Sequence, residues 1–171
     1  MWTHRSVWSL ALAVGVAGAA ACGSESTTPL EAPEAGSVVA GVTPELVATL
    51  DEAFQEENLA LYTYRRVLAD YGAVTPFRHI EASESTHVVA VAGLYAGLGL
   101  VPPVSVWNLS NVERFGTFSA ACAGGVAIET ADGALYDRLL LQALPDEAVR
   151  VFTNLRRASL EHHLPAFSKC Q

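Results

Sequence analysis

The sequence predicts an all-α fold, an up-down bundle of four helices with a long crossover connection between the second and third helices. The chain has 171 residues, of which 51% are hydrophobic and 16% charged, enough for one globular domain with its own core. Many of its glycines and prolines lie before Thr43 or in the stretch GLGLVPPVSVWNLS. The long Ala- and Leu-rich blocks between them carry apolar residues at helical spacing.

The first 21 residues are typical of a signal peptide. Arg5 precedes the apolar run SLALAVGVAGAAA, which is too short to span a bilayer and ends in small residues. The small residues before Cys22 in AAACGS resemble the lipobox of bacterial lipoproteins, whose cysteine is lipidated after cleavage. Ordinary cleavage near AAA, with Cys22 free or paired, is the alternative. We therefore expect an exported protein, anchored by lipid to the periplasmic or extracellular face of the bacterial cell envelope.

Residues 22–42 are expected to form a flexible tether, because they mix Ser, Thr, Pro, Gly and Glu without periodicity. The folded domain is then predicted to cover residues 43–171. Removal of residues 1–21 leaves nine basic and eighteen acidic side chains, a net charge of −9, which argues against nucleic acid as a partner. Contact with a membrane is expected through the N-terminal lipid only.

The first helix is predicted over residues 44–71, with Thr43 as the N-cap, Pro44 at the first helical position and a stop at Gly72. Steps of four and three residues trace the stripe that faces the core, which comprises Leu46, Leu50, Ala53, Glu57, Ala60, Tyr64, Val67 and Tyr71. Glu57 is the one acid in this stripe.

The second helix is predicted to open in the same way as the first, with Thr75 as the cap and Pro76 at the first helical position. Glu84 and His87 occupy consecutive positions of its apolar stripe. The two residues lie three apart on one face, where packing would bury them without water. A buried charge needs a partner. The pair is therefore either a Glu–His hydrogen bond that fills a gap in the core or part of a metal site.

A Pro-rich connection follows Gly99 and is expected to cross from one end of the bundle toward the other. The third helix is predicted over roughly residues 119–144, with Glu129 as the third acid on an inward face. Asp132 lies about one turn further on, and it either joins that face or is an ordinary surface acid.

The fourth helix is predicted to run from about Pro145 to about Ser168. At 100° per residue, His163 falls near the centre of the helix's apolar arc and His162 falls toward its edge. His163 is therefore the first candidate for an imidazole that points into the core, and His162 is the second. Polar, metal-capable side chains thus recur near mid-length in the apolar stripes of all four helices. Divalent cations would supply the countercharge that such a buried cluster needs, which predicts a metal centre.

Four stretches carry a resemblance to known proteins: EENLALYTYRRVLADYG, PFRHIEASESTHVVAV, AIETAD and FTNLRRASLEHHLPAF. They are similar to the helices of ferritin-like di-iron carboxylate bundles, and more closely to a bacterial ferritin-like family of unknown function, over approximately residues 44–168. The resemblance implies that Glu57, Glu84, His87 and Glu129 are metal ligands. It also implies iron or manganese, as one or two ions, as the cofactor.

The fourth helix departs from the di-iron pattern, in which Glu-x-x-His recurs. Leu160 stands three residues before His163, and Ser159 stands three before His162, so one carboxylate is missing. Asp132 is the candidate to replace it. Otherwise the centre would hold one metal ion, or two in unlike surroundings.

The activity implied by the resemblance is redox chemistry at iron or manganese with dioxygen or peroxide. Tyr64 and Tyr136 would lie close enough to supply an electron or a proton, although core aromatics with satisfied hydroxyls are the alternative. A non-catalytic metal-binding module and a purely structural bundle at the cell envelope are the competing interpretations. The sequence does not decide whether the bundle forms a homodimer.

The remaining cysteines, Cys122 and Cys170, are expected to form a disulfide. In an exported protein a leftover pair is more often bridged than free. Antiparallel third and fourth helices would also place the start of one beside the end of the other, where these two cysteines lie. Unpaired small core thiols are the alternative.

Overall fold

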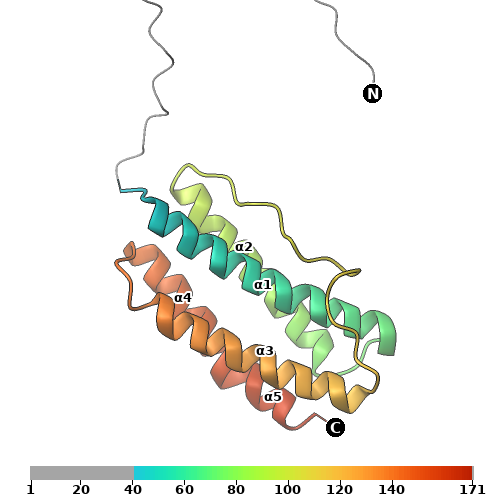
Figure 1. Cartoon of the computed structure of the whole chain (residues 1–171). Helices are drawn as coiled ribbons and strands as arrows, with labels where there is room; N and C mark the ends of the chain where they lie inside the picture. The colour runs from blue at the N-terminus through green and yellow to red at the C-terminus, as the bar shows by residue number, and fades with distance from the viewer. Residues whose placement is uncertain (1–40, 171) are drawn as a thin grey trace, which may run out of the picture. The chain divides into compact units, whose positions relative to one another are not determined.

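The computed structural model describes residues 41–170, and these form an all-helical bundle without strands (Figure 1). The helices are α1 (Pro44–Tyr71), α2 (Phe77–Gly97), α3 (Phe118–Leu139), α4 (Asp146–Ala158), the single π-helical turn η1 (Ser159–His163) and α5 (Leu164–Ser168). Because α4, η1 and α5 follow one another without a break, they make up the fourth rod of the bundle. The predicted signal peptide and the lipidation site Cys22 lie outside the described residues, as does nearly all of the predicted tether.

The rods follow the predicted course. α1 and α2 form an antiparallel pair, and residues 98–117 then run back along the bundle, so that α3 begins at the end where α1 finishes (Figure 1). The fourth rod returns antiparallel to α3. Gln55 on α1 holds the crossover in place, since its side chain donates to the carbonyl of Val104 and accepts from the N–H of Val106. The prediction of an all-α four-helix bundle is confirmed.

The ends of α1 match the sequence signals. The Thr43 hydroxyl accepts from the N–H of Leu46 at 3.1 Å, and Gly72 ends the helix with a φ of 83°, which favours glycine. The expected capping role of Thr75 in α2 is wrong, because the first amide groups of that helix are satisfied by the backbone carbonyls of Val74 and Pro76.

The predicted C-terminus of the third helix is also wrong by five residues. α3 ends at Leu139, and the amides of Leu141 and Gln142 bond to carbonyls three residues back, which tightens the chain into a turn. The Gln142 side chain accepts from the Thr49 hydroxyl at 2.5 Å, so this turn is tied to α1.

Two apolar clusters fill the bundle. One contains Leu50, Tyr95, Tyr136 and Phe152, and the other contains Tyr64, Phe77 and Phe167. Cys122 belongs to the second cluster and forms a disulfide with Cys170, with Cα atoms 5.6 Å apart, so the start of α3 is joined to the end of the fourth rod. Within the described residues, no helix combines the length and apolar character that a membrane span requires.

Candidate metal centre

Six buried ionisable side chains come from the middle stretches of all four rods, and we call them the carboxylate–histidine centre. They are Glu57 from α1, Glu84 and His87 from α2, Glu129 and Asp132 from α3, and His163 from η1. None of the six is more than 8% exposed. They interrupt apolar stripes, so the packing that builds the core also withdraws them from water.

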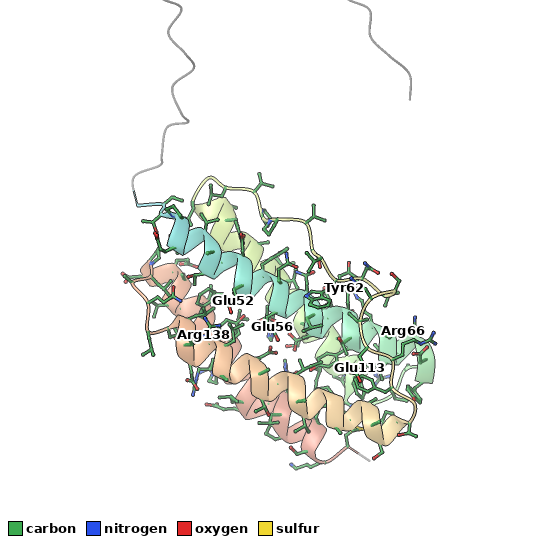
Figure 2. All side chains as sticks on the ribbon, in the orientation of Figure 1. Glu52, Glu56, Tyr62, Arg66, Glu113 and Arg138 are labelled. Atoms are coloured by element: carbon green, nitrogen blue, oxygen red, sulfur yellow. A yellow bond between two sulfur atoms is a disulfide. The ribbon has the colours of Figure 1, made fainter. Side chains whose placement is uncertain are left out.

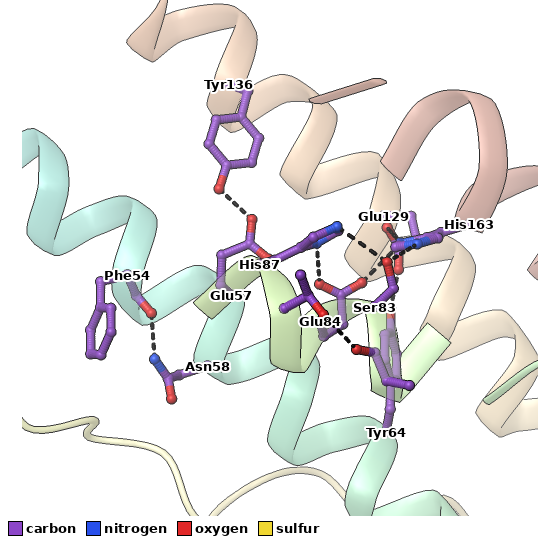
Figure 3. Close-up of polar contacts among 12 residues, drawn as sticks. Phe54, Glu57, Asn58, Tyr64, Ser83, Glu84, His87, Glu129, Tyr136 and His163 are labelled. Atoms are coloured by element: carbon purple, nitrogen blue, oxygen red, sulfur yellow. Dashed lines mark hydrogen bonds and ion pairs between the residues drawn. The ribbon is translucent and has the colours of Figure 1, made fainter. Parts of the chain in front are cut away.

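Glu84 lies between the two imidazoles (Figure 3). Its Oε2 is 2.8 Å from Nδ1 of His87, and its Oε1 is 2.9 Å from Nδ1 of His163. Each of these nitrogens also faces a second carboxylate, Glu57 Oε2 at 3.2 Å and Glu129 Oε2 at 3.3 Å. Glu84 is therefore shared by two triplets, Glu57–Glu84–His87 and Glu84–Glu129–His163, in each of which the potential ligand atoms lie within 4.8 Å of one another.

Two tyrosines bind the outer glutamates reciprocally. The Tyr64 hydroxyl on α1 donates to Oε1 of Glu129 on α3 at 2.6 Å, and the Tyr136 hydroxyl on α3 donates to Oε1 of Glu57 on α1. Each tyrosine follows the glutamate of its own helix by seven residues, so α1 and α3 contribute the same pair of groups. In both glutamates Oε1 is held by a phenol and Oε2 is left facing an imidazole.

Ser83 contacts both histidines from the opposite side. Its Oγ is 3.2 Å from Nε2 of His87 and 3.1 Å from Nε2 of His163, and the two rings stack with centroids 5.4 Å apart. When this hydroxyl accepts from both Nε2–H groups, each neutral ring carries its lone pair on Nδ1, the nitrogen that faces the carboxylates. Outer hydrogen bonds of this kind fix the tautomer and the ring orientation of metal-binding histidines.

The buried side-chain atoms without a hydrogen-bond partner in residues 41–170 all belong to this centre. They are Oε2 of Glu57, Oε1 of Glu84, Oε2 of Glu129, both oxygens of Asp132 and Nδ1 of His163. Nδ1 of His163 and Oε1 of Glu84 are close in distance, yet their alignment does not make a hydrogen bond. A buried polar atom without a partner is costly, so six in one place indicate that another partner belongs there.

Burial shifts the protonation of the centre. It raises the pKa of Glu57 to about 8, although the imidazole of His87, 3.2 Å away, acts in the opposite direction. Burial also acts to raise the pKa of Glu84, but the close imidazoles of His163 and His87 outweigh it and lower that pKa to about 2. For the imidazoles burial is outweighed by the facing carboxylates, and the pKa rises to about 10 for His87 and about 9 for His163. Without metal, protons therefore supply the positive charge at neutral pH.

Asp132 is buried, with 1% exposure, but it is not part of either triplet. Burial raises its pKa well above the usual range, and the charges of Glu57, Glu129, Glu84 and Glu56 raise it further. The expectation that Asp132 is a simple surface acid is thus wrong, whereas its role as a replacement ligand stays a prediction.

His162, the second candidate ligand from this helix, is exposed and lies outside the centre, whereas His163 is 5% exposed and lies inside it. Both fall in the π-helical turn η1, which contains one more residue per turn than an α-helix. The buried residue one turn before His163 is Ser159, and Leu160 beside it is half-buried. The fourth rod therefore supplies no carboxylate to the centre.

Ser83 and the reciprocal bonding of the tyrosines were missed by the sequence-based reasoning. A signal was present for the tyrosines, because the spacing Glu-x6-Tyr occurs in both the first and third helices. No comparable signal marks Ser83, since serine beside a buried residue is common and its contact with His163 depends on the packing of two helices.

Comparisons with known proteins support the fold. No protein-family model and no curated protein matches the chain. Among solved structures, a hypothetical protein, MJ0754, from Methanococcus jannaschii is similar, with a TM-score of 0.65, 24% identity, and coverage of 74% of this chain and 79% of that one. A conserved hypothetical protein, rv2844, from Mycobacterium tuberculosis is also similar, with a TM-score of 0.63 and 13% identity. The match covers 75% of this chain and 98% of that one. At these identities the likeness shows the helical fold alone.

Proposed function

We propose that this protein is a ferritin-like metalloprotein that binds two divalent ions, iron or manganese, through the carboxylate–histidine centre. The observation that carries the proposal is the pair of buried triplets around Glu84, together with the gathering of the unpartnered buried side-chain atoms in the same place. Carboxylate oxygens and neutral imidazole nitrogens are the ligands that iron and manganese accept.

Charge balance supports two ions rather than one. The centre contains four carboxylates, which carry four negative charges when ionised, and two histidines, which bind metal in their neutral form. Two divalent cations would neutralise this set. Glu57 and His87 would hold one ion, Glu129 and His163 the other, and Glu84 would serve both.

The protein's own groups would orient these ligands. The phenols of Tyr136 and Tyr64 hold one oxygen of Glu57 and of Glu129, and Ser83 holds the far nitrogens of both imidazoles. The surrounding apolar clusters keep bulk water away. Iron or manganese bound in this position would supply one-electron redox chemistry with dioxygen or peroxide as the oxidant.

A second candidate function is metal binding without turnover. It is favoured by the fourth rod, where Ser159 and Leu160 stand in place of a carboxylate. A purely structural role for the buried Glu–His pairs is the third possibility.

Metal analysis of protein purified without chelator, followed by oxygen consumption on addition of Fe(II), separates the three. We expect about two ions per chain, in line with the two triplets. Glu84→Gln should abolish binding, and Glu81→Gln is the matched control, because Glu81 lies one turn earlier on α2 and pairs with Arg65 at the surface. Oxygen consumption would indicate an oxidase, and bound metal without consumption would indicate a binding protein. Wild-type protein without metal would refute the proposal.

We also propose that the chain is exported and lipid-anchored through Cys22, on the support of the sequence AAACGS. Detergent phase partitioning of the expressed protein tests this, because Cys22→Ala should move the protein from the detergent phase to the aqueous phase. An unchanged distribution would contradict the anchor.

A further inference from the structure

A surface hollow of about 370 Å³ lies between α1 and α3, where it is lined by Glu52, Glu56, Ala131, Ala134, Leu135 and Arg138. Figure 2 shows Glu52, Glu56 and Arg138 in the space between these two helices. The small side chains of Ala131 and Ala134 leave room along this seam. Arg138 is ion-paired with Glu52 across the hollow, with Nη1 3.0 Å from Oε2.

Asp132 lies directly behind this surface. It follows Ala131 in α3, yet its side chain is only 1% exposed, and neither of its oxygens has a hydrogen-bond partner. The carboxylates that act on it belong both to the centre (Glu57, Glu129 and Glu84) and to the hollow (Glu56). Asp132 is thus a buried carboxyl group without a hydrogen-bond partner, and it lies between the surface acid Glu56 and the proposed metal ligands.

We propose that the hollow between α1 and α3 is the entrance by which divalent cations reach the carboxylate–histidine centre, with Glu56 at the mouth and Asp132 as an internal transfer site. This inference rests on the metal-binding function proposed above. It adds a route and two residues that are separate from the two ligand triplets.

The physical reason is the cost of moving a doubly charged ion from water into an apolar interior. A route is passable when carboxylates replace the lost water contacts in steps, and the two unpartnered oxygens of Asp132 offer such a step. Within the described residues Glu56 has no ion pair, so its charge is available at the mouth, whereas Glu52 is neutralised by Arg138.

A larger hollow, of about 480 Å³, does not compete as an entrance. It lies among Leu46, Leu50, Leu94 and Leu98 near the start of α4, and Glu147 is the only charged residue in its lining. An apolar wall neither attracts a cation nor replaces its hydration shell.

Stopped-flow uptake of Co²⁺ by the metal-free full chain, followed by its visible absorption at low ionic strength, tests the route. We expect Glu56→Gln to slow uptake about threefold, because negative charge at the mouth accelerates the arrival of cations. Asp132→Asn should slow uptake about tenfold, because a neutral amide replaces the lost water contacts of a cation less well than a carboxylate does. The final number of ions should be unchanged in Glu56→Gln, because Glu56 is outside both triplets. Arg138→Gln should accelerate uptake, and Glu113→Gln, an exposed acid on the crossover, should behave as wild type. The differences caused by Glu56→Gln and Arg138→Gln should shrink in high salt, because salt screens charges at the surface.

The outcomes separate this inference from the proposed function. Wild-type rates in both Glu56→Gln and Asp132→Asn would overturn the entrance while leaving the metal centre intact. An Asp132→Asn protein that ends one ion short would make Asp132 a ligand of the centre and would also overturn its transfer role. Absence of Co²⁺ uptake by the wild type would remove the proposed function itself. Thermal melting of each variant confirms that it is folded. Asp132→Asn should melt no lower than wild type, because the raised pKa of Asp132 keeps its carboxyl group protonated in metal-free protein, and Asn matches that neutral group in size and charge.

Discussion

Glu84 faces two imidazoles at once, so the loss of its charge affects both halves of the carboxylate–histidine centre. In metal-free protein the two histidines are protonated near neutral pH, and Glu84, with a pKa of about 2, stays ionised between them. This arrangement is a buried ion triad. Removing one member of such a group leaves buried charge without compensation.

Glu84→Gln should therefore lower the free energy of unfolding of the metal-free protein by about 3 kcal/mol. The pKa of both histidines should fall at the same time, because each loses its nearest anion. Urea unfolding and NMR titration of the imidazoles measure the two effects. Glu81→Gln should cost no more than about 1 kcal/mol, because it breaks only the partly exposed pair with Arg65. Equal costs for the two variants would contradict the buried triad.

Tyr64→Phe and Tyr136→Phe should destabilise the protein by similar amounts, about 1–3 kcal/mol each. Each change leaves one buried glutamate oxygen without its donor, and the two contacts are reciprocal. Tyr62→Phe is the control, since its ring lies under Arg65 near the surface and its hydroxyl makes no hydrogen bond in the described part of the chain. Thermal melting of the three variants would refute the proposed role of the phenols if Tyr62→Phe had the largest effect.

Single residues of the centre were predictable to different degrees. Glu57, Glu84 and His87 could be found because an acid or imidazole at an apolar position of a regular helix stands out. His163 was preferred over His162 only by projection, and the π-helical turn that contains both could not be read from the sequence. Asp132 was placed near the inward face, but its separation from the triplets depends on how α1 and α3 pack.

At the scale of the elements, helix starts were predictable where a side chain makes the cap. α1 begins as its Thr-Pro signal indicates, whereas the same signal misled for α2, where backbone carbonyls do the capping. The end of α3 was predicted too late, because the Leu-rich run up to Leu144 has helical character. In the structure the helix ends at Leu139, and Gln142 in the turn that follows is bound to Thr49 on α1. Local pattern identifies the rods, and packing decides their ends.

The disulfide Cys122–Cys170 should stabilise the pairing of α3 with the fourth rod. It closes a loop of 48 residues, for which chain entropy gives a contribution of about 4 kcal/mol. Unfolding of Cys122→Ala/Cys170→Ala in urea, compared with wild type in oxidising buffer, measures this contribution. Wild type in reducing buffer should match the double variant. Labelling of two free thiols in oxidised, unfolded wild type would show that the bond does not form.

For the whole molecule, the centre makes the stability of metal-free protein depend on pH. The pKa values of His87 and His163 are raised from 6.5 to about 10 and about 9, and that of Glu57 from 4.5 to about 8. Between pH 6.5 and 9 the folded state thus binds more protons than the unfolded state. The free energy of unfolding should fall as the pH rises, by about 1.4 kcal/mol per pH unit for each extra proton. Urea titrations with chelator at pH 6.5, 7.5 and 8.5 measure this slope.

Excess metal should change the sign of that dependence. Metal ions replace the protons on the imidazoles and carboxylates, so their affinity rises as the pH rises. The stabilisation by Fe(II) or Mn(II) should therefore be larger at pH 8.5 than at pH 6.5. A stabilisation independent of pH would indicate binding somewhere other than the carboxylate–histidine centre.

The most direct test of the central claim is anomalous scattering from a crystal grown with iron or manganese. The account predicts two peaks inside the bundle, one among Glu57, Glu84 and His87 and the other among Glu84, Glu129 and His163. A bundle interior without an anomalous peak, in a crystal with metal bound only at the surface, would contradict it.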